Sequence, residues 1–333
     1  MPTRTPRAEL RSGTAGLPIV ARFPALAEVP RVALGSYPTP VVAASAIAPQ
    51  LWVKRDDLCA NPVGGNKARA LEFLLGGIVR GDSVVTVGSA GSTHALTVAT
   101  YAKQLGVRTF VGRWRQEMND TAHVVAERTG ALAEAAPIFR TPVEAYVWAA
   151  TKRLRGARWI AAGGSTPLGI LGHVNAGLEL VDQIDAGALP MPKYVVVPLG
   201  TGGTVAGIAL AFSIAARPVT VIGARVVPKI VARAARVRRL ADATARLIEG
   251  KTGSKVPRIE ASRVVIAHET YGGAYGRETD AGRAAAERMQ LIAGVRLDPT
   301  YSAKALTRAI ALAADAPTVF WLTFDSRVVT NNR

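Results

Sequence analysis

A lysine follows two glycines in the segment Gly64-Gly65-Asn66-Lys67. Glycine permits backbone conformations and close approaches that a Cβ would block. Asn66 is a good helix N-cap, so we expect Lys67 in the first turn of the helix that follows. The partial positive charge of a helix N-terminus disfavours an ammonium and lowers its pKa. Lys67 is therefore a candidate neutral nucleophile toward an aldehyde, and an ordinary surface lysine after a turn is the alternative.

A second segment, at residues 200–204, joins an apolar strand to an apolar helix. It reads Gly200, Thr201, Gly202, Gly203 and Thr204. Such a loop points backbone N–H groups at an anion, and the helix dipole adds to the attraction. The pattern is neither that of a dinucleotide-binding loop nor a P-loop, so a single phosphate fits it best. A tight structural turn is the alternative.

A third junction leads from a strand at 83–87 into Ser92, Thr93 and His94. Free N–H groups and hydroxyls at a helix start can bind a carboxylate, such as that of an amino acid. His94 is either a ligand contact or a structural histidine. The other three histidines have no neighbours at metal-ligand spacing, so no metal site is expected. They are His123, His173 and His268.

The segments between these junctions alternate between short β-branched runs and helical patterns. Strands are expected at 51–54, 83–87, 109–111, 159–161, 194–197, 219–224 and 318–323. Helices are expected at 67–79, 92–105, 120–128, 143–154, 174–184, 205–215 and 278–292, after an irregular lead-in at 1–35. This alternation predicts an open, mostly parallel α/β sheet, in which ligands bind at the carboxyl ends of strands.

The composition narrows the class of protein. The 333 residues suffice for two lobes, or for one large domain with a smaller insert. Residues 1–22 contain no apolar run of signal-peptide length, and no later run reaches the length of a membrane span. The single cysteine, Cys59, excludes a disulfide within the chain. We therefore expect a soluble cytoplasmic protein.

The net charge of +17 raises the question of nucleic-acid binding. The densest basic region, residues 229–263, holds ten Lys and Arg against three acids. No aromatic residue is interleaved there for base stacking. A solvated basic helix and loop is the favoured interpretation, and nucleic acid is not an expected partner.

The three junctions, in this order and spacing, resemble the family of 1-aminocyclopropane-1-carboxylate deaminase and D-cysteine desulfhydrase, fold type II pyridoxal-phosphate enzymes of the tryptophan-synthase-β-like class. The segments 34–40, 54–58, 163–169 and 297–305 extend the resemblance over most of the chain. It implies a larger cofactor-binding lobe from 1–69 plus 166–333 and a smaller inserted lobe from 70–165. Pyridoxal 5'-phosphate would lie between the lobes, and the protein would be a homodimer.

The resemblance also implies roles for individual residues. Lys67 aligns with the lysine that forms a Schiff base with the cofactor, and residues 200–204 align with the phosphate cup. The catalytic residues implied are Lys67, Ser92, Tyr275 and Tyr301. The cofactor-binding residues implied are Asn66, Lys67, Thr93, Gly200, Thr201, Gly202, Gly203, Thr204 and Ser302. The substrate-binding residues implied are Ser92, Thr93 and His94.

By this resemblance, Ser302 aligns with the residue that faces the pyridine nitrogen of the cofactor. In the deaminase branch of the family that residue is a glutamate. A hydroxyl cannot stabilise a pyridinium by charge. It suits removal of an α-proton followed by loss of a β-substituent, which predicts a lyase that converts a small amino acid to a 2-oxo acid and ammonia. A racemase or β-replacement enzyme on the same cofactor, or a catalytically degenerate cofactor-binding protein, is the alternative.

Three departures from the family pattern stand out. Thr93 replaces an asparagine that generally bonds the ring oxygen of the cofactor. Ala70 replaces a second lysine, so that Arg69 or another cation would have to assist phosphate binding. The segment 321–326 differs from the usual ending of the family, which leaves the substrate open.

Overall fold

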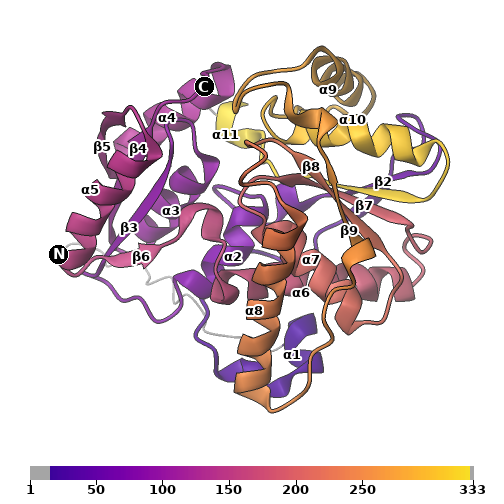
Figure 1. Ribbon diagram of the computed structural model, residues 1–333, viewed down its shortest axis with the longest axis horizontal. Helices are drawn as coiled ribbons and strands as arrows, with labels where there is room; N and C mark the ends of the chain where they lie inside the picture. Colours follow the sequence, from indigo (N-terminus) through magenta and orange to yellow (C-terminus); the bar gives the residue numbers. More distant parts are fainter. Residues whose placement is uncertain (1–15, 331–333) are drawn as a thin grey trace, which may run out of the picture.

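The computed structural model describes residues 16–330 and contains two open sheets that lie side by side (Figure 1). The larger has the strand order β1-β2-β10-β7-β8-β9 and the smaller β5-β4-β3-β6. Neighbouring strands are parallel throughout, except β1 against β2. The predicted mostly parallel α/β fold is therefore confirmed.

The strands are short, and most are apolar. In the larger sheet they are β1 (Val41–Ala43), β2 (Leu51–Lys54), β7 (Tyr194–Leu199), β8 (Thr220–Arg225), β9 (Val264–Ala267) and β10 (Thr318–Trp321). In the smaller sheet they are β3 (Ser83–Ser89), β4 (Arg108–Trp114), β5 (Glu134–Phe139) and β6 (Arg158–Ile160). The sequence pattern predicts seven of these ten and misses β1, β5 and β9.

Helices cover both faces of each sheet. The long ones are α2 (Asn66–Leu74), α3 (Thr93–Gln104), α4 (Asp120–Leu132), α5 (Pro142–Leu154), α6 (Pro167–Asp185), α7 (Gly203–Ile214), α8 (Ala234–Thr252), α9 (Asp280–Ala293) and α10 (Ser302–Ala313). The cores show why β7 is continuously apolar. Val195 and Val197 pack in the core with α6, α7 and α8, whereas Val196 packs in the core with α9 and α10.

Two local predictions are wrong. The helix expected at 67–79 ends at Leu74, before the pair Gly76 and Gly77, and Gly77 has a left-handed φ of +70° that a helix cannot continue through. The lead-in is not irregular throughout, since α1 (Pro18–Arg22) and a 3-10 turn at Pro24–Glu28 pack on the core through Ile19 and Leu26. The first fifteen residues of that lead-in lie outside the described residues.

The helix α2 lies at the seam between the two sheets, because it packs against α6 of the larger part and α3 of the smaller part. The strands of the smaller sheet run from 83 to 160, inside the range 70–165 expected for the inserted lobe. The lobe boundaries themselves stay a prediction. Among residues 16–330, no helix combines the length and the apolar character needed to cross a membrane.

Candidate active site

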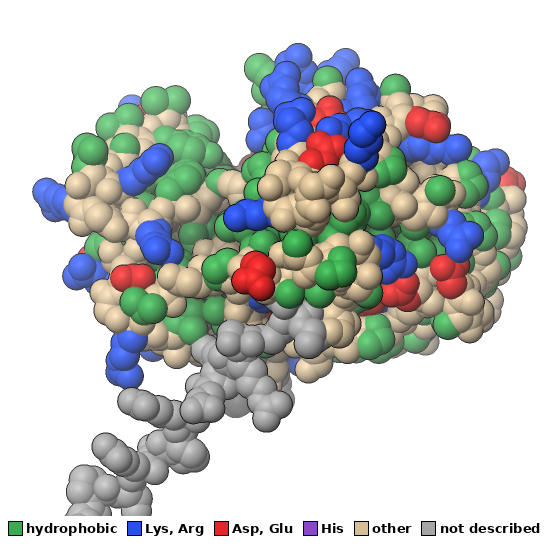
Figure 2. Space-filling model, turned by 90° about the horizontal axis from the view of Figure 1, so that it is seen from below, with side chains coloured by type: hydrophobic (Ala, Val, Ile, Leu, Met, Phe, Trp, Pro, Cys, Tyr) green, Lys and Arg blue, Asp and Glu red, His purple; other side chains and the backbone are tan. Residues whose placement is uncertain are grey.

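A cavity of about 700 Å³ lies between the two parts, and Figure 2 shows the outer surface hollowed there. Its volume falls in the range of small-molecule sites. The cavity brings together all but one of the site residues that the sequence predicts, and Ser302 is the exception. Those that line it are Asn66, Lys67, Ser92, Thr93, His94, Gly200, Thr201, Gly202, Gly203, Thr204, Tyr275 and Tyr301.

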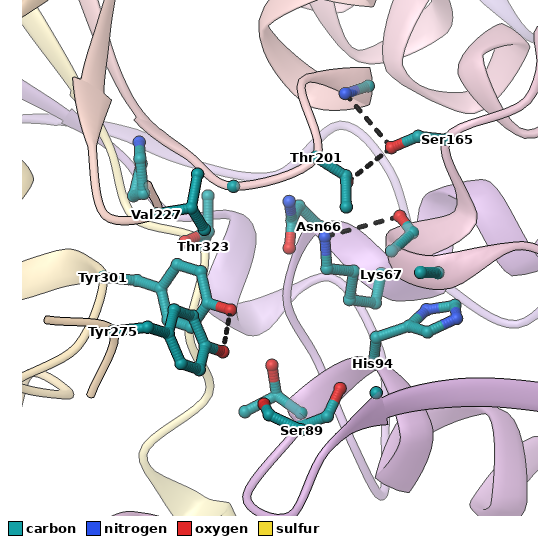
Figure 3. A pocket seen from close by; sticks show the side chains of 18 of the residues that line it. Asn66, Lys67, Ser89, His94, Ser165, Thr201, Val227, Tyr275, Tyr301 and Thr323 are labelled. Carbon is teal, nitrogen blue, oxygen red and sulfur yellow. Dashed lines mark hydrogen bonds between the residues drawn. The ribbon is translucent and has the colours of Figure 1, made fainter. Parts of the chain in front are cut away.

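Lys67 projects into the middle of this cavity (Figure 3). Its Nζ lies 3.5 Å from the carbonyl oxygen of Gly163, and no acidic partner is within ion-pair distance among the described residues. Burial lowers the pKa of Lys67 to about 8. An amine with such a pKa is partly neutral near physiological pH and can attack an aldehyde.

The start of α2 differs from the prediction in one residue. Asn66 is not the N-cap, because Gly65 caps the helix with a φ of +93°. A Cβ on Gly65 would be 2.3 Å from the carbonyl oxygen of Thr323, so only glycine fits. Asn66 is the first helical residue, and its Nδ2 donates to Oγ1 of Thr204 over 2.7 Å. Asn66 therefore joins the lysine helix to the glycine-rich loop.

The glycine-rich loop, residues 200–204, follows β7 and opens toward the cavity. Gly202 has a φ of +99°, a conformation that glycine adopts without strain. Ser165 crosses over the loop: its Oγ is 2.6 Å from Oγ1 of Thr201 and accepts the backbone N–H of Gly203 at 3.2 Å (Figure 3). Hydroxyls and N–H groups at the start of the twelve-residue α7 form a cradle for an anion.

Ser92 and Thr93 begin α3 on the smaller part. Ser92 is the N-cap, and its Oγ accepts the backbone N–H of Ala95 at 3.3 Å. Thr93 is the first helical residue, with its side chain at the cavity wall. The positive end of this helix dipole therefore faces the cavity, as a bound carboxylate would need.

His94 has a strong structural tie. Its Nε2 lies 3.1 Å from Oγ1 of Thr86 on β3, and the side chain is buried. Burial, and then the charge of Lys67, lower the pKa of His94 to about 3. The imidazole is therefore neutral and cannot attract a carboxylate by charge, although it forms part of the cavity wall.

Tyr275 and Tyr301 face Lys67 from the opposite side (Figure 3). Their hydroxyls are hydrogen-bonded to each other, and their rings meet edge to face with centroids 5.9 Å apart. Burial raises the pKa of both phenols, and Ser89 also hydrogen-bonds Tyr275. Both phenols therefore hold their protons at neutral pH and can act as proton donors.

Ser302 lies behind Tyr301 at the start of α10, fully buried. Its Oγ has no partner at full hydrogen-bond geometry among the described residues, but it lies close enough to the Asp298 carboxylate to oppose the rise that burial causes in the pKa of that group. The neighbouring Asp298 accepts the backbone N–H groups of Tyr301 at 2.6 Å and Ser302 at 3.0 Å. Asp298 thus fixes the turn that presents Tyr301 to the cavity.

The sequence interpretation names neither Asp298 nor Ser165 as a site residue, although both line the cavity. Each lies in a segment that carries the family resemblance, at 297–305 and 163–169. Their location in segments that match the family is the signal by which the sequence could have identified them. Within residues 16–330, no three His, Cys, Asp or Glu side chains are grouped as metal ligands.

Pyridoxal phosphate fits these residues. The cradle at 200–204 suits one phosphate group, because its hydroxyls and N–H groups lie at the start of α7. Lys67 supplies an amine of lowered pKa in the same cavity. Ser302 adds nothing to this fit, because it is fully buried and does not line the cavity.

Comparison with known proteins gives the same assignment. The chain is 32% identical to the nocardicin C-9' epimerase of Nocardia uniformis subsp. tsuyamanensis, over 90% of this chain and 94% of that protein. It is 27% identical to the D-cysteine desulfhydrase of Klebsiella pneumoniae (strain 342), over 84% and 88%. A crystal structure of an ACC deaminase homologue matches 92% of this chain and 94% of its own, with a TM-score of 0.76 and 27% identity.

The family model of pyridoxal-phosphate dependent enzymes matches residues 32–323, which span both sheets and all of the cavity-lining residues except Phe324, Asp325 and Val328. With the amine, the anion cradle and the parallel sheets in place, the chain belongs to the family of pyridoxal-phosphate dependent enzymes.

Proposed function

We propose that this protein is a lyase that removes the α-proton of a small amino acid and expels a β-substituent, after which water hydrolyses the unsaturated product to a 2-oxo acid and ammonia. The observation that carries the proposal is the placement of Lys67 opposite the Tyr275–Tyr301 pair, in one cavity with the glycine-rich loop (Figure 3). The D-cysteine desulfhydrase relative supports elimination as the reaction and D-cysteine as a first substrate to test.

Bound pyridoxal phosphate supplies an aldehyde that condenses with amines and a conjugated ring that withdraws electrons from Cα. Residues 200–204 would hold its phosphate, and Lys67 is the residue that would hold its aldehyde carbon. When not so engaged, the Nζ of Lys67 would accept the α-proton of the substrate. Its lowered pKa suits this role, because a base must be neutral before it can take a proton.

The remaining residues position the substrate and handle a second proton. The N-terminus of α3 at Ser92 and Thr93 binds the substrate carboxylate through backbone N–H groups. The phenol of Tyr275 or Tyr301 donates a proton to the departing β-substituent. The family resemblance would place the neutral hydroxyl of Ser302 at the pyridine nitrogen, but Ser302 lies behind Tyr301 and does not line the cavity.

Racemisation or epimerisation is the second candidate, and one observation favours it. Lys67 and the tyrosine pair occupy opposite walls of the cavity, so a proton could be removed from one side and returned from the other (Figure 3). The relative at 32% identity is named an epimerase. In this chemistry no β-substituent leaves, and the product is an amino acid of inverted configuration.

The test is an assay of the purified protein, loaded with pyridoxal phosphate, against D- and L-amino acids that include D-cysteine. We expect a band near 410–430 nm, about the range of a protonated Schiff base, together with release of sulfide and keto acid. Chiral inversion without keto acid would favour the racemase. A yellow protein that is inert toward the whole panel would contradict both reactions and indicate a non-catalytic cofactor-binding protein.

A labelling experiment isolates the lysine. Borohydride reduction of the loaded protein should fix the cofactor on the peptide that contains Lys67, and Lys67→Ala should lose both the label and turnover. A label on another peptide, or full turnover by Lys67→Ala, would overturn the assignment.

We further propose that the protein works in the cytoplasm as a homodimer. The exposed apolar side chains of α5, Val143, Val147 and Leu154, are a candidate contact surface between the two copies. Sedimentation equilibrium should give twice the chain mass, and a monomer at micromolar concentration would contradict the dimer.

A further inference from the structure

We infer that Arg236, in the first turn of α8, is the cation that binds the phosphate group of pyridoxal phosphate. The inference rests on the cofactor and not on the choice between elimination and racemisation. It answers a question that the sequence raises, because Ala70 stands where many family members place a second lysine near the phosphate.

The contacts of Arg236 place it at the glycine-rich loop. It lines the cavity, and its Nε donates to the carbonyl oxygen of Thr201 at 3.2 Å. Its charge also reaches Tyr146 across the cavity, where it opposes the rise that burial causes in the pKa of that phenol. The exposed guanidinium therefore lies beside the glycine-rich loop, at the edge of the cavity.

The other candidate cations are committed elsewhere or lie apart from the loop. Arg69 is buried between two carboxylates, 2.6 Å from Asp56 and 3.0 Å from Glu179. Lys67 must remain free to react with the aldehyde. Arg115 lines the cavity from the end of β4, with no hydrogen bond to the loop. Among the described residues, Arg236 is thus the arginine or lysine that both lines the cavity and bonds residues 200–204.

The chemistry of a guanidinium suits the task. A bound phosphate carries close to two negative charges. The backbone N–H of Gly203 already donates to Oγ of Ser165, so it is not wholly available to the phosphate. Arg236 uses only Nε within the described residues, which leaves its two terminal nitrogens free to bind phosphate oxygens as a fork. Figure 2 shows Lys and Arg side chains gathered beside the hollow, where α8 lies, so the local potential also attracts an anion.

The test compares two ligands that differ only in the phosphate. Apo protein is titrated with pyridoxal phosphate and with pyridoxal, and the Schiff-base absorbance reports each affinity. We expect Arg236→Ala to weaken pyridoxal phosphate about tenfold and to leave pyridoxal unchanged, since only the phosphate interaction is lost. Arg236→Lys should recover part of the loss, because the positive charge remains.

The matched control is Arg246→Ala, which removes the same charge from the same helix. Arg246 is exposed and lies ten residues further along α8, a rise of about 15 Å. That exceeds the screening length of about 8 Å at physiological salt, so its effect on either ligand should be negligible. Equal losses in the two arginine variants would show a general effect of net charge and overturn the inference.

Two other results would also overturn the inference about Arg236. One is an unchanged affinity of Arg236→Ala for pyridoxal phosphate, and the other is an equal loss of affinity for pyridoxal phosphate and pyridoxal. If Arg236→Ala failed to fold, Arg236→Gln and competition by inorganic phosphate at varied salt would give the same discrimination. A wild-type protein that bound neither ligand would overturn the inference together with the cofactor, whereas retained phosphate discrimination without turnover would contradict the proposed function alone.

Discussion

The reactivity of Lys67 comes from burial in a cavity that offers it no counter-charge. Its Nζ faces the carbonyl oxygen of Gly163, and burial lowers its pKa to about 8. The lowered pKa agrees with the expectation, and loss of water around the buried amine is its cause. A side chain with these properties should react with aldehydes in a strongly pH-dependent manner.

The rate at which the apo protein captures pyridoxal phosphate should therefore rise with pH and level off above about 8. Below that value the amine is mostly protonated, so each unit of pH should change the rate about tenfold. Stopped-flow absorbance at fixed cofactor concentration measures it. A midpoint near the ordinary lysine value of 10.5 would contradict the burial argument.

Removal of one phenol should separate catalysis from cofactor binding. Tyr275→Phe keeps the ring contact with Tyr301 and removes only the proton donor. We expect kcat to fall by about 100-fold or more, in the range of general acid catalysis, with little change in the affinity for pyridoxal phosphate. Steady-state kinetics and the cofactor titration check this, and an unchanged kcat would assign the proton to another group.

At the scale of residues, the sequence predicts those site residues whose role depends on their neighbours along the chain. Lys67 and residues 200–204 can be found because glycines and helix starts are local patterns. The position of Ser302 behind the cavity wall, and the pairing of Tyr275 with Tyr301, depend on contacts between separate elements. The use of Arg69 in a buried ion-pair network is equally non-local, so sequence alone leaves it as a candidate phosphate cation.

Among the elements, α2 is the one whose start is fixed most tightly. Gly65 lies against the carbonyl oxygen of Thr323, just beyond β10, and its φ of +93° is left-handed. The next residue, Asn66, donates from its backbone N–H to that same carbonyl at 3.3 Å. A larger residue at position 65 would displace the helix and, with it, Lys67.

Gly65→Ala should therefore lower the free energy of unfolding by about 2–4 kcal/mol, from left-handed strain plus the collision with Thr323. Gly81→Ala is the matched control, because Gly81 has the same φ of +93° and nothing within 4 Å of an added Cβ. It should cost only about 1–2 kcal/mol. Urea unfolding gives both values, and equal costs would show that the contact with Thr323 is unimportant.

The sequence predicts elements well where both faces are buried and poorly at the edges. The apolar runs of β2, β7 and β8 are recognised because helices cover them on both sides. β1 and β5 lie at sheet edges with exposed residues, so their sequences lack that signal. α10 is missed because its start depends on the cap by Asp298, which only the folded turn reveals.

In the molecule as a whole, a buried network of charges joins the lysine helix to the larger part. Glu179 on α6 binds Arg69 of α2 at 3.0 Å and Lys54 of β2 at 2.5 Å. Burial alone would raise the pKa of Glu179, but the charges of Arg69 and Lys54 outweigh it and lower the pKa to about 2. The network therefore stabilises the fold only while this carboxylate stays ionised.

Glu179→Gln should destabilise the protein by about 3–5 kcal/mol, because buried Lys54 loses its ion-pair partner and buried Arg69 keeps only Asp56. The folded pKa of Glu179 lies below its ordinary value of 4.5, so its contribution is complete above about pH 4.5 and is lost as pH falls toward 2. Urea unfolding across that window should show a steeper loss for the wild type than for the variant.

The control for Glu179 is Asp185→Asn, which breaks the exposed pair with Arg217. Both side chains are more than a third exposed, so the cost should stay below about 1 kcal/mol. A similar cost for both variants would contradict the special role of the buried network.

The hydrogen bonds that residues 322–325 make to residues 57–64, just before Lys67, have a consequence for biosynthesis. Leu322 accepts the backbone N–H of Asp57 at 3.1 Å, and the carboxylate of Asp325 accepts that of Gly64 at 2.8 Å. These residues leave the ribosome more than 250 positions after the lysine they hold in place. Lys67 can therefore be held in its described position only after residue 325 has been synthesised.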